Sequence, residues 1–277
     1  MNKLLTVIIL IFSLCFILAA CDRSQGNGES VNYSQGLEFV SNGDGTCFVN
    51  GIGSCTDTHI KVPPVSPEGE SVITISKTAF KQFNNLTDLT IPDSIVSLGS
   101  LQNQAMGYCP DLKNINIGEN HPDFKSVDGV VYYKNGSTLV WYPCGRTESS
   151  YTVPSGTYSI SMFAFNGCKN LTEVILPDEC EFIGSNAFRG CTSLESITLP
   201  AGIKDIQNST FMACTSLKNI VILGNISKVG DLCFIQCPAL TDVYFAGSEE
   251  DWEKIDFGSD NDILTNANIH YNYTPKN

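Results

Sequence analysis

Histidine, tryptophan and positive charge are scarce in this chain. Its 277 residues include only 3 His and 2 Trp, and 16 Lys and Arg stand against 29 Asp and Glu, which gives a formal net charge of -13. A nucleic-acid-binding protein needs a basic face to displace counterions from phosphates, so the charge argues against that class. The histidines, His59, His121 and His270, are scattered and form no HExxH motif. We expect each of them to be structural.

Signatures of catalysis are missing as well. The sequence has no G-x-S-x-G turn and no Cys-His pair that spacing could assemble. It also has no phosphate-binding loop, because Gly51-Ile52-Gly53 lacks a third glycine and a following helix. We therefore expect a non-enzymatic protein with no cofactor, no resident metal and no small-molecule substrate. A carboxylate pair acting on glycans would be invisible in a sequence and stays an open alternative.

The sequence contains one long hydrophobic run, from Leu4 to Ala20, which follows a single early cation at Lys3. This pattern is typical of a secretory signal peptide, and the run is slightly short for a bilayer span of about 20 residues. Its end, Leu18-Ala19-Ala20-Cys21, resembles the lipobox of bacterial lipoproteins. The resemblance implies a signal peptide over residues 1–20 and acylation of Cys21, which would anchor an exported protein in the bacterial cell envelope through an N-terminal lipid. An ordinary signal peptide or an uncleaved anchor is the alternative.

The residues that follow Cys21 are polar. Segment 22–33 contains Gly, Ser and Asn and almost no apolar side chains. Such a composition predicts a flexible tether, which we place at 21–35, ahead of a folded domain over 36–277. A merely disordered terminus would behave in the same way.

A 23-residue repeat runs through the second half of the chain. Taking Phe as position zero, Cys recurs at position three, Leu at position six, and apolar residues at positions nine, eleven and eighteen. The position-zero residues are Phe165, Phe188, Phe211 and Phe234, and the position-three residues are Cys168, Cys191, Cys214 and Cys237. Looser copies begin at Phe80 and Met106, and partial copies surround Ile60 and Tyr151.

The spacing within one repeat predicts its structure. Positions nine and eleven are apolar while positions eight and ten are mostly polar, as in a strand with one buried face. Pro177 and Pro200 follow and would end the strand, because proline cannot continue the ladder of backbone hydrogen bonds. One unit cannot bury its apolar face alone, whereas stacked units share a continuous core. The sequence therefore predicts a β-rich solenoid.

The motif Ala-Phe-x-x-Cys-x-x-Leu-x-x-Val-x-Leu-Pro, seen from Ala164 to Pro177, resembles the BspA-type leucine-rich repeats of bacterial surface proteins. The resemblance covers roughly residues 36–273, and six copies carry the motif. It implies a leucine-rich-repeat right-handed superhelix with a parallel β-sheet on one face. It also implies surface display and adhesion. The segment from Val243 through Trp252 to Tyr271 is similar to the C-terminal coil of that family.

We divide the domain into end caps and repeats. Short strands separated by glycine turns predict an N-terminal cap over 36–63, the repeats extend over about 64–245, and a C-terminal cap over 246–277 would cover the open apolar end. Segment 118–150 departs from the repeat. Within it, two apolar runs flank Lys134-Asn135-Gly136-Ser137, which predicts an inserted β-hairpin.

The 12 cysteines raise the question of disulfides and metals. Stacked repeats would hold neighbouring cysteine Cβ atoms about 4.8 Å apart, beyond the usual disulfide range of about 3.5–4.5 Å, so we expect mostly free, buried thiols. A zinc cluster is the alternative, which is disfavoured because cysteines stacked in a row do not surround a tetrahedral metal ion. Cys47 and Cys55, near each other across a glycine turn, are the candidate disulfide. Asp256, Asp260 and Asp262 lack the spacing of a calcium loop, and we expect a solvated loop there.

The outward positions eight and ten of each predicted strand form the candidate ligand-binding face. They are Asp88, Thr90, Asn114, Asn116, Glu173, Ile175, Ser196, Thr198, Asn219, Val221, Asp242 and Tyr244. A strip of mixed side chains on a rigid sheet is the way in which solenoids present extended binding surfaces. A face that is only solvated is the alternative.

These observations lead to one expected function and one alternative. We expect a cell-surface lipoprotein that acts as a non-catalytic binding or adhesion scaffold for proteins or glycans of a host or of neighbouring cells. The adhesion role follows from the resemblance alone, because a fold does not determine a ligand. The alternative is a structural or self-assembling envelope protein without a host ligand.

Replacement of Cys21 tests the lipid anchor. The variant Cys21→Ala cannot be acylated at this position, so we expect it to leave the membrane fraction for the periplasm or the medium, as followed by cell fractionation and immunoblotting. A variant that stays in the membrane fraction would refute lipidation at Cys21.

Overall fold

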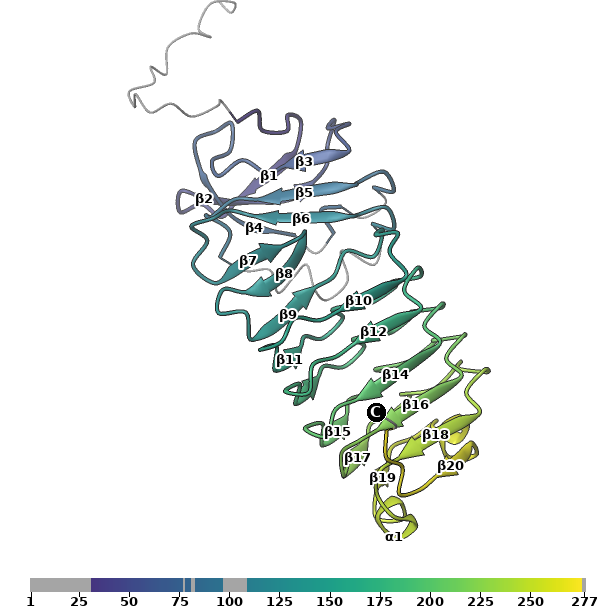
Figure 1. Cartoon of the computed structure of the whole chain (residues 1–277). Coiled ribbons are helices and arrows are strands. Elements are labelled where there is room, and N and C mark those ends of the chain that lie inside the picture. Colours follow the sequence, from purple (N-terminus) through teal and green to yellow (C-terminus); the bar gives the residue numbers. More distant parts are fainter. Residues whose placement is uncertain (1–30, 77, 81–82, 97–108, 276–277) are drawn as a thin grey trace, which may run out of the picture. The chain divides into compact units, whose positions relative to one another are not determined.

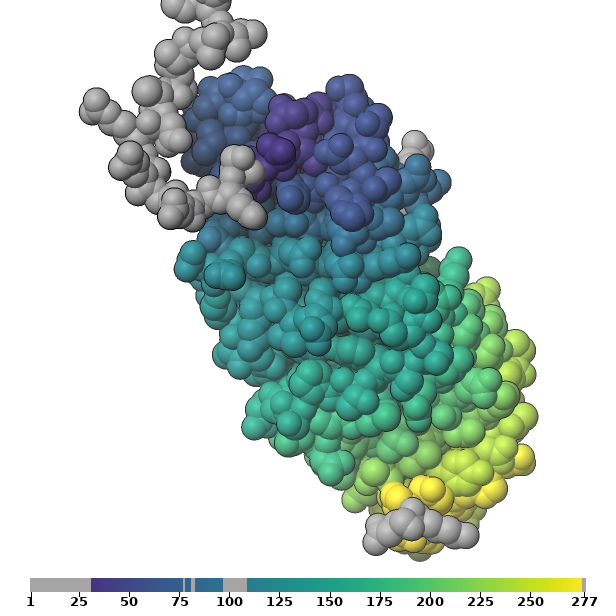
Figure 2. All heavy atoms as spheres, turned by 45° about the horizontal axis from the view of Figure 1, so that its top comes forward, coloured from purple at the N-terminus to yellow at the C-terminus, as the bar shows by residue number. Residues whose placement is uncertain are grey.

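A computed structural model of the chain describes residues 31–76, 78–80, 83–96 and 109–275. The predictions for the signal peptide, for Cys21 and for most of the tether fall outside these residues. Tyr33–Asn277 forms one compact unit, in which successive coils stack to make a β-solenoid (Figure 1). Figure 2 shows the sequence colours of this unit following one another in bands, as expected when each coil contacts its neighbours in the sequence.

Two parallel sheets contain the predicted repeat strands. The C-terminal parallel sheet has six strands in the order β10-β12-β14-β16-β18-β20, and the N-terminal parallel sheet has three in the order β3-β5-β6. The six strands are β10 (Ser150–Thr152), β12 (Glu173–Ile175), β14 (Ser196–Leu199), β16 (Asn219–Ile222), β18 (Asp242–Phe245) and β20 (Asn268–His270). The three strands are β3 (His59–Lys61), β5 (Asp88–Ile91) and β6 (Asn114–Ile117). The parallel sheet expected from the family resemblance is thus present, but in two pieces.

The second half of each coil adds further strands. A five-stranded sheet has the order β13-β11-β9-β8-β7, and a three-stranded sheet has the order β15-β17-β19. The five strands are β7 (Phe124–Val127), β8 (Val130–Tyr133), β9 (Thr138–Trp141), β11 (Ser159–Ile160) and β13 (Phe182–Ile183). The three strands are β15 (Asp205–Ile206), β17 (Lys228–Val229) and β19 (Asp256–Phe257). The apolar residue at position eighteen therefore lies in a short strand of its own.

The inward positions of the repeat stack in rows through the core. Phe165, Phe188, Phe211 and Phe234 are fully buried, and their rings lie face to face with centroids 5.0, 5.5 and 5.4 Å apart. Tyr142 lies 23 residues before Phe165 and extends the stack at 5.1 Å. Each ring therefore contacts rings of the adjacent coils, as the repeat predicts.

Each coil turns sharply two residues after its Phe. Gly167 and Gly190 occupy this position with φ of 75° and 72°, and Ala213 and Gln236 adopt the same left-handed conformation with φ of 61°. Glycine reaches this region without steric cost, whereas other residues lose about 1–2 kcal/mol there. Packing of the flanking Phe and Cys side chains in the core overrides that cost in the last two coils.

Segment 118–150 forms more than the predicted hairpin. Strands β8 and β9 pair antiparallel around the expected turn, but β7 pairs antiparallel with β8 as well, and β9 pairs in parallel with β11 of the next coil. The segment is therefore a three-stranded meander joined to the solenoid and not an isolated insertion. The hydrogen-bonding groups along the edge of β9 meet those of β11, which explains the continuity.

The meander separates two hydrophobic cores. On β8, Val130 and Tyr132 belong to the C-terminal core, whereas Val131 belongs to the N-terminal core; on β9, Leu139 and Val140 divide in the same way. Alternate side chains of a strand point to opposite faces, so both faces of these strands are covered. This double burial accounts for their continuous apolar runs.

Further elements lie at both ends of the solenoid. At the N-terminal end, β1 (Glu38–Ser41) pairs antiparallel with β2 (Thr46–Gly51), which pairs in parallel with β4 (Ser71–Ile75). At the C-terminal end lie the short helices α1 (Glu249–Trp252) and α2 (Asp262–Thr265). Ser248 and Asp251 form a capping box that starts α1, and the Trp252 ring packs against Phe245 with centroids 5.3 Å apart.

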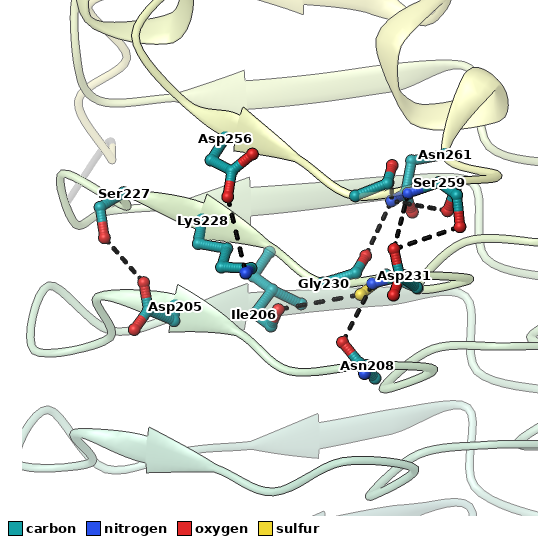
Figure 3. A network of polar contacts seen from close by, with 12 residues as sticks. Asp205, Ile206, Asn208, Ser227, Lys228, Gly230, Asp231, Asp256, Ser259 and Asn261 are labelled. Atoms are coloured by element: carbon teal, nitrogen blue, oxygen red, sulfur yellow. Dashed lines mark hydrogen bonds and ion pairs between the residues drawn. The ribbon is translucent and has the colours of Figure 1, made fainter.

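Polar side chains complete the C-terminal end (Figure 3). The side-chain oxygen of Asn208 accepts a hydrogen bond from the Asp231 backbone N–H at 3.0 Å, and the Asp231 carboxylate accepts one from the Ser259 N–H at 2.8 Å. The buried Asn261 amide donates to the Gly230 carbonyl at 2.8 Å, while its oxygen accepts from the Phe234 N–H at 3.4 Å. These side chains satisfy backbone groups that the terminal coils would otherwise leave unpaired.

Truncation of one ring tests the stacked core. Phe188→Ala leaves a cavity between Phe165 and Phe211, and we expect it to lower the free energy of unfolding by about 3–5 kcal/mol in urea denaturation. Phe182→Ala is the control, because that side chain is 47% exposed and its loss should cost about 1 kcal/mol or less. Equal destabilisation by both changes would contradict the central role of the stack.

Candidate binding face

The predicted face residues occupy the outward positions of the two parallel sheets. Asp88, Thr90, Asn114 and Asn116 lie on β5 and β6, while the other eight lie on β12, β14, β16 and β18. All twelve are exposed or half-buried, and the residues between them on each strand are buried. The structure therefore places these side chains outward, as the alternation predicted. It does not place them in a single strip, because the meander lies between β6 and β10 in the chain and the two parallel sheets do not pair.

Parallel register aligns the outward side chains of the C-terminal parallel sheet in two columns, which we call the C-terminal face. The first column comprises Ser150, Glu173, Ser196, Asn219, Asp242 and Asn268. The second column comprises Thr152, Ile175, Thr198, Val221, Tyr244 and His270. The first column consists of carboxylates, amides and hydroxyls, whereas the second contains most of the apolar and aromatic groups.

Two histidines also lie on the outward faces of the parallel sheets, although the sequence did not predict them there. His59 on β3 contacts the Asp88 carboxylate at 3.2 Å, and the Asn114 amide donates to the same carboxylate at 2.9 Å. His270 on β20 contacts the Asp242 carboxylate at 2.8 Å. Alternation around Ile60 and Ile269 is the sequence signal that could have placed both histidines on outward positions. The third, His121, is fully buried, and its Nε2 hydrogen-bonds the Ile95 carbonyl at 2.7 Å, which is a structural role.

Aromatic rings gather at the end of the C-terminal face. Tyr244 stacks on His270 with ring centroids 4.6 Å apart, and the ring of Tyr273 contacts Tyr244 in a tilted arrangement at 5.0 Å. The hydrogen bond from His270, followed by that from Thr241, holds the pKa of the Asp242 carboxyl below its usual range. Asp242 is therefore a charged acceptor at neutral pH.

The repeat cysteines are buried hydrogen-bond donors to the preceding coil. The thiols of Cys191, Cys214 and Cys237 donate to the carbonyls of Phe165, Phe188 and Phe211 at 3.1, 3.1 and 3.0 Å. The sequence indicates that these cysteines act as small apolar residues, but it gives no sign of the hydrogen bond from each thiol to the preceding coil. The same carbonyls accept the backbone N–H of the Cys in their own coil. Each thiol thus satisfies a second lone pair inside the core.

The chemistry of these thiols does not resemble that of a reactive or metal-binding site. Burial raises the pKa of Cys109 and Cys233 to about 12 and that of Cys237 to about 11, so the nucleophilic thiolate is suppressed. In the described part of the chain, no three His, Cys, Asp or Glu side chains are grouped as metal ligands. A structural role for the repeat cysteines follows from their geometry.

The predicted disulfide between Cys47 and Cys55 is not formed in the structure, where both thiols are free and buried. Cys47 lies within β2 between β1 and β4, and its thiol faces the Glu70 carbonyl at 3.8 Å. Cys55 follows a turn closed by its own N–H bonding to the Ile52 carbonyl at 2.8 Å. Proximity in sequence therefore does not bring the two sulfur atoms together.

No helix within the described ranges is long and apolar enough to cross a membrane. The segment expected to be a solvated loop contains short elements: Asp256 lies in β19 and pairs with Lys228 at 3.5 Å, and Asp262 begins α2.

Alkaline unfolding tests the buried thiols. In the unfolded chain a thiol ionises near pH 9, whereas in the folded protein ionisation is delayed to about 11–12. Above about pH 9 the unfolded state therefore holds fewer protons, and stability should fall by about 1.4 kcal/mol per pH unit for each such thiol. Urea denaturation under reducing conditions at pH 8, 9 and 10 measures this slope. The variant Cys233→Ala/Cys237→Ala should reduce the slope by the contribution of two thiols, about 2.8 kcal/mol per pH unit, whereas a slope of zero in the unsubstituted protein would refute burial of the thiols.

Comparison with known proteins agrees with this geometry. The family model for the BspA type leucine rich repeat region matches residues 55–135 and 140–263 with 6 copies. A leucine-rich repeat protein of Eubacterium ventriosum is similar with a TM-score of 0.55 and 21% identity over 73% of this chain, which spans 54% of that protein. The pneumococcal vaccine antigen PcpA is similar with a TM-score of 0.55 and 19% identity, over 78% of this chain and 68% of the antigen.

At these identities the two structures show the fold alone, and no match was found among curated protein sequences. The family model carries the assignment, because it covers well over half of the chain. This chain belongs to the family of proteins with BspA type leucine-rich repeats.

Proposed function

We propose that this protein is a non-catalytic binding scaffold displayed on the bacterial cell surface, where it contacts macromolecules of a host or of neighbouring cells. The observation that carries the proposal is the C-terminal face, on which twelve side chains from six strands stand in two aligned columns. Because the backbone below is a hydrogen-bonded sheet, the columns are fixed before any partner arrives, and little ordering entropy opposes binding.

The composition of the face supports protein binding. Ile175 is 46% exposed, and Val221 and Tyr244, on β16 and β18 of the same sheet, are partly exposed. Interfaces combine such apolar and aromatic contacts with a surrounding set of polar groups. The net charge of -13 disfavours nucleic acid as a partner.

Surface display rests on three observations of different kinds. The N-terminal sequence predicts export and acylation at Cys21, the polar segment after it predicts a tether, and the repeats place the chain in a family of bacterial repeat proteins. The structurally similar pneumococcal protein is a vaccine antigen, and surface exposure of the present chain is part of the proposal. The lipid would then hold the protein at the membrane while the tether lets the solenoid reach outward.

A structural or self-assembling role is the second candidate. Strand β20 is the last strand of the C-terminal parallel sheet in the described residues, and a strand at the edge of a sheet can pair with another chain. This role predicts concentration-dependent oligomers, which size-exclusion chromatography with light scattering would detect.

Binding assays on the full chain in detergent test the proposal. The chain is presented to a panel of extracellular-matrix proteins and intact cells, and we expect Tyr244→Ala to weaken the recorded binding roughly tenfold, because buried Tyr contacts often dominate an interface. Asn116→Ala reports whether the N-terminal parallel sheet takes part. Tyr158→Ala is the matched control, since this exposed Tyr precedes β11 away from the face. Binding that is indifferent to all three changes, or oligomers without any binding, would refute the proposal.

A further inference from the structure

The C-terminal face combines negative charge with an apolar strip and carries no lysine or arginine. Among the twelve side chains of its two columns, Glu173 and Asp242 are acidic, and His270 is the sole residue able to become cationic. The adjacent Lys218 is already paired with Glu195 at 2.9 Å. Any partner that covers this face must therefore bring the positive charge itself.

The two carboxylates keep their charge available. Glu173 is exposed and accepts a hydrogen bond from the Ser150 hydroxyl at 3.1 Å. Asp242 accepts from the Thr241 hydroxyl at 2.8 Å and from His270 at 2.8 Å. The Ser150 and Thr241 hydroxyls are neutral donors that orient the carboxylates, whereas His270 pairs with Asp242 and would neutralise it only when the imidazole is protonated. An incoming cation would find two preorganised acceptors.

The spacing of these acceptors matches an extended polypeptide. Glu173 and Asp242 lie three coils apart in the first column, through Ser196 and Asn219, which corresponds to about 14 Å at about 4.8 Å per strand. An extended chain advances about 3.4 Å per residue, so two cations four residues apart would span about the same distance. Their side chains point the same way, while the residues between them alternate toward the second column, where Ile175 and Val221 lie.

Two other occupants fit less well. A second copy of this chain would bring its own Glu173 and Asp242 against the first pair, with no Lys or Arg in the columns to compensate. A glycan would need an open aromatic face, but the Tyr244 ring is stacked on His270 and is also contacted by the tilted ring of Tyr273.

We propose that the C-terminal face binds an extended basic polypeptide segment, with two cationic side chains about four residues apart against Glu173 and Asp242 and aliphatic side chains over Ile175 and Val221. This proposal rests on the proposed function and names the chemistry of its partner. Arginine suits both acceptors, because its guanidinium can bind a carboxylate through two hydrogen bonds.

Fluorescence anisotropy with a synthetic probe tests the proposal on the full chain in detergent. The probe is a labelled peptide containing Arg-Val-Ser-Val-Arg, and the control peptide has Glu in place of both arginines. We expect binding of the first peptide alone, weakened as NaCl is raised. The double variant Glu173→Gln/Asp242→Asn should lower the affinity at least tenfold. Its matched control, Glu179→Gln/Glu181→Gln, removes the same charge from the exposed turn after β12 and should leave the affinity within twofold.

A pair of substitutions at Thr198, in the middle of the face, separates this proposal from the proposed function. T198K and T198E add side chains of similar length and opposite charge, so we expect T198K to weaken peptide binding at least tenfold and T198E to preserve or strengthen it. If both substitutions weaken binding equally in the assay with matrix proteins and cells, the face remains a binding surface, but the proposal of a basic partner is refuted. No effect of either on panel binding would overturn the face itself. Binding of the Glu peptide, or of neutral glycans in place of the Arg peptide, would also overturn the basic partner.

Discussion

The structure depends on one constraint: no coil can bury its own apolar side chains. The rings of Phe165, Phe188 and Phe211 are each covered by rings of the coils on either side, and Phe234 ends the stack, at centroid distances near 5 Å. Stacking of identical inward positions forces successive strands into parallel register, and this register also aligns the outward positions. The candidate binding face is thus a consequence of the core. Side chains alternate between the two faces of a strand, so a register that stacks the inward side chains in rows also aligns the outward side chains in columns.

The same constraint explains the cysteines. A carbonyl at position zero accepts one hydrogen bond from the backbone of its own coil and has a second lone pair in a region closed to water. A thiol from the next coil reaches that lone pair while filling the space of a small apolar residue. Valine would fill the space without the hydrogen bond, and serine would bring a stronger donor with a higher cost of burial. Beyond the last repeat, the Asn261 side chain bonds other backbone groups, the Gly230 carbonyl and the Phe234 N–H.

The meander divides what would otherwise be a uniform array. Its central strands are covered on both sides, so each half of the solenoid has its own core. The division also separates two faces of different chemistry. The N-terminal parallel sheet presents His59 and Lys61 with Asp88, whereas the C-terminal face has acidic side chains and no lysine or arginine. A partner that spans both faces would have to complement both charge patterns.

Periodicity in the amino-acid sequence was sufficient to predict the coil length, the main repeat strands, their inward and outward positions and the row of cysteines without disulfides. Each of these features depends on neighbours two or 23 residues apart. The tertiary structure decided the remainder. It decided that β9 pairs with β11, that β6 and β10 remain apart, and that His270 reaches Asp242. These contacts depend on which strand edges and side chains meet across an irregular segment. Such encounters involve long and unequal sequence separations, for which a repeat carries no signal. The Cys47 and Cys55 thiols illustrate this difference, since they are only eight positions apart in the chain while the sheet around β2 directs the Cys47 thiol to the Glu70 carbonyl.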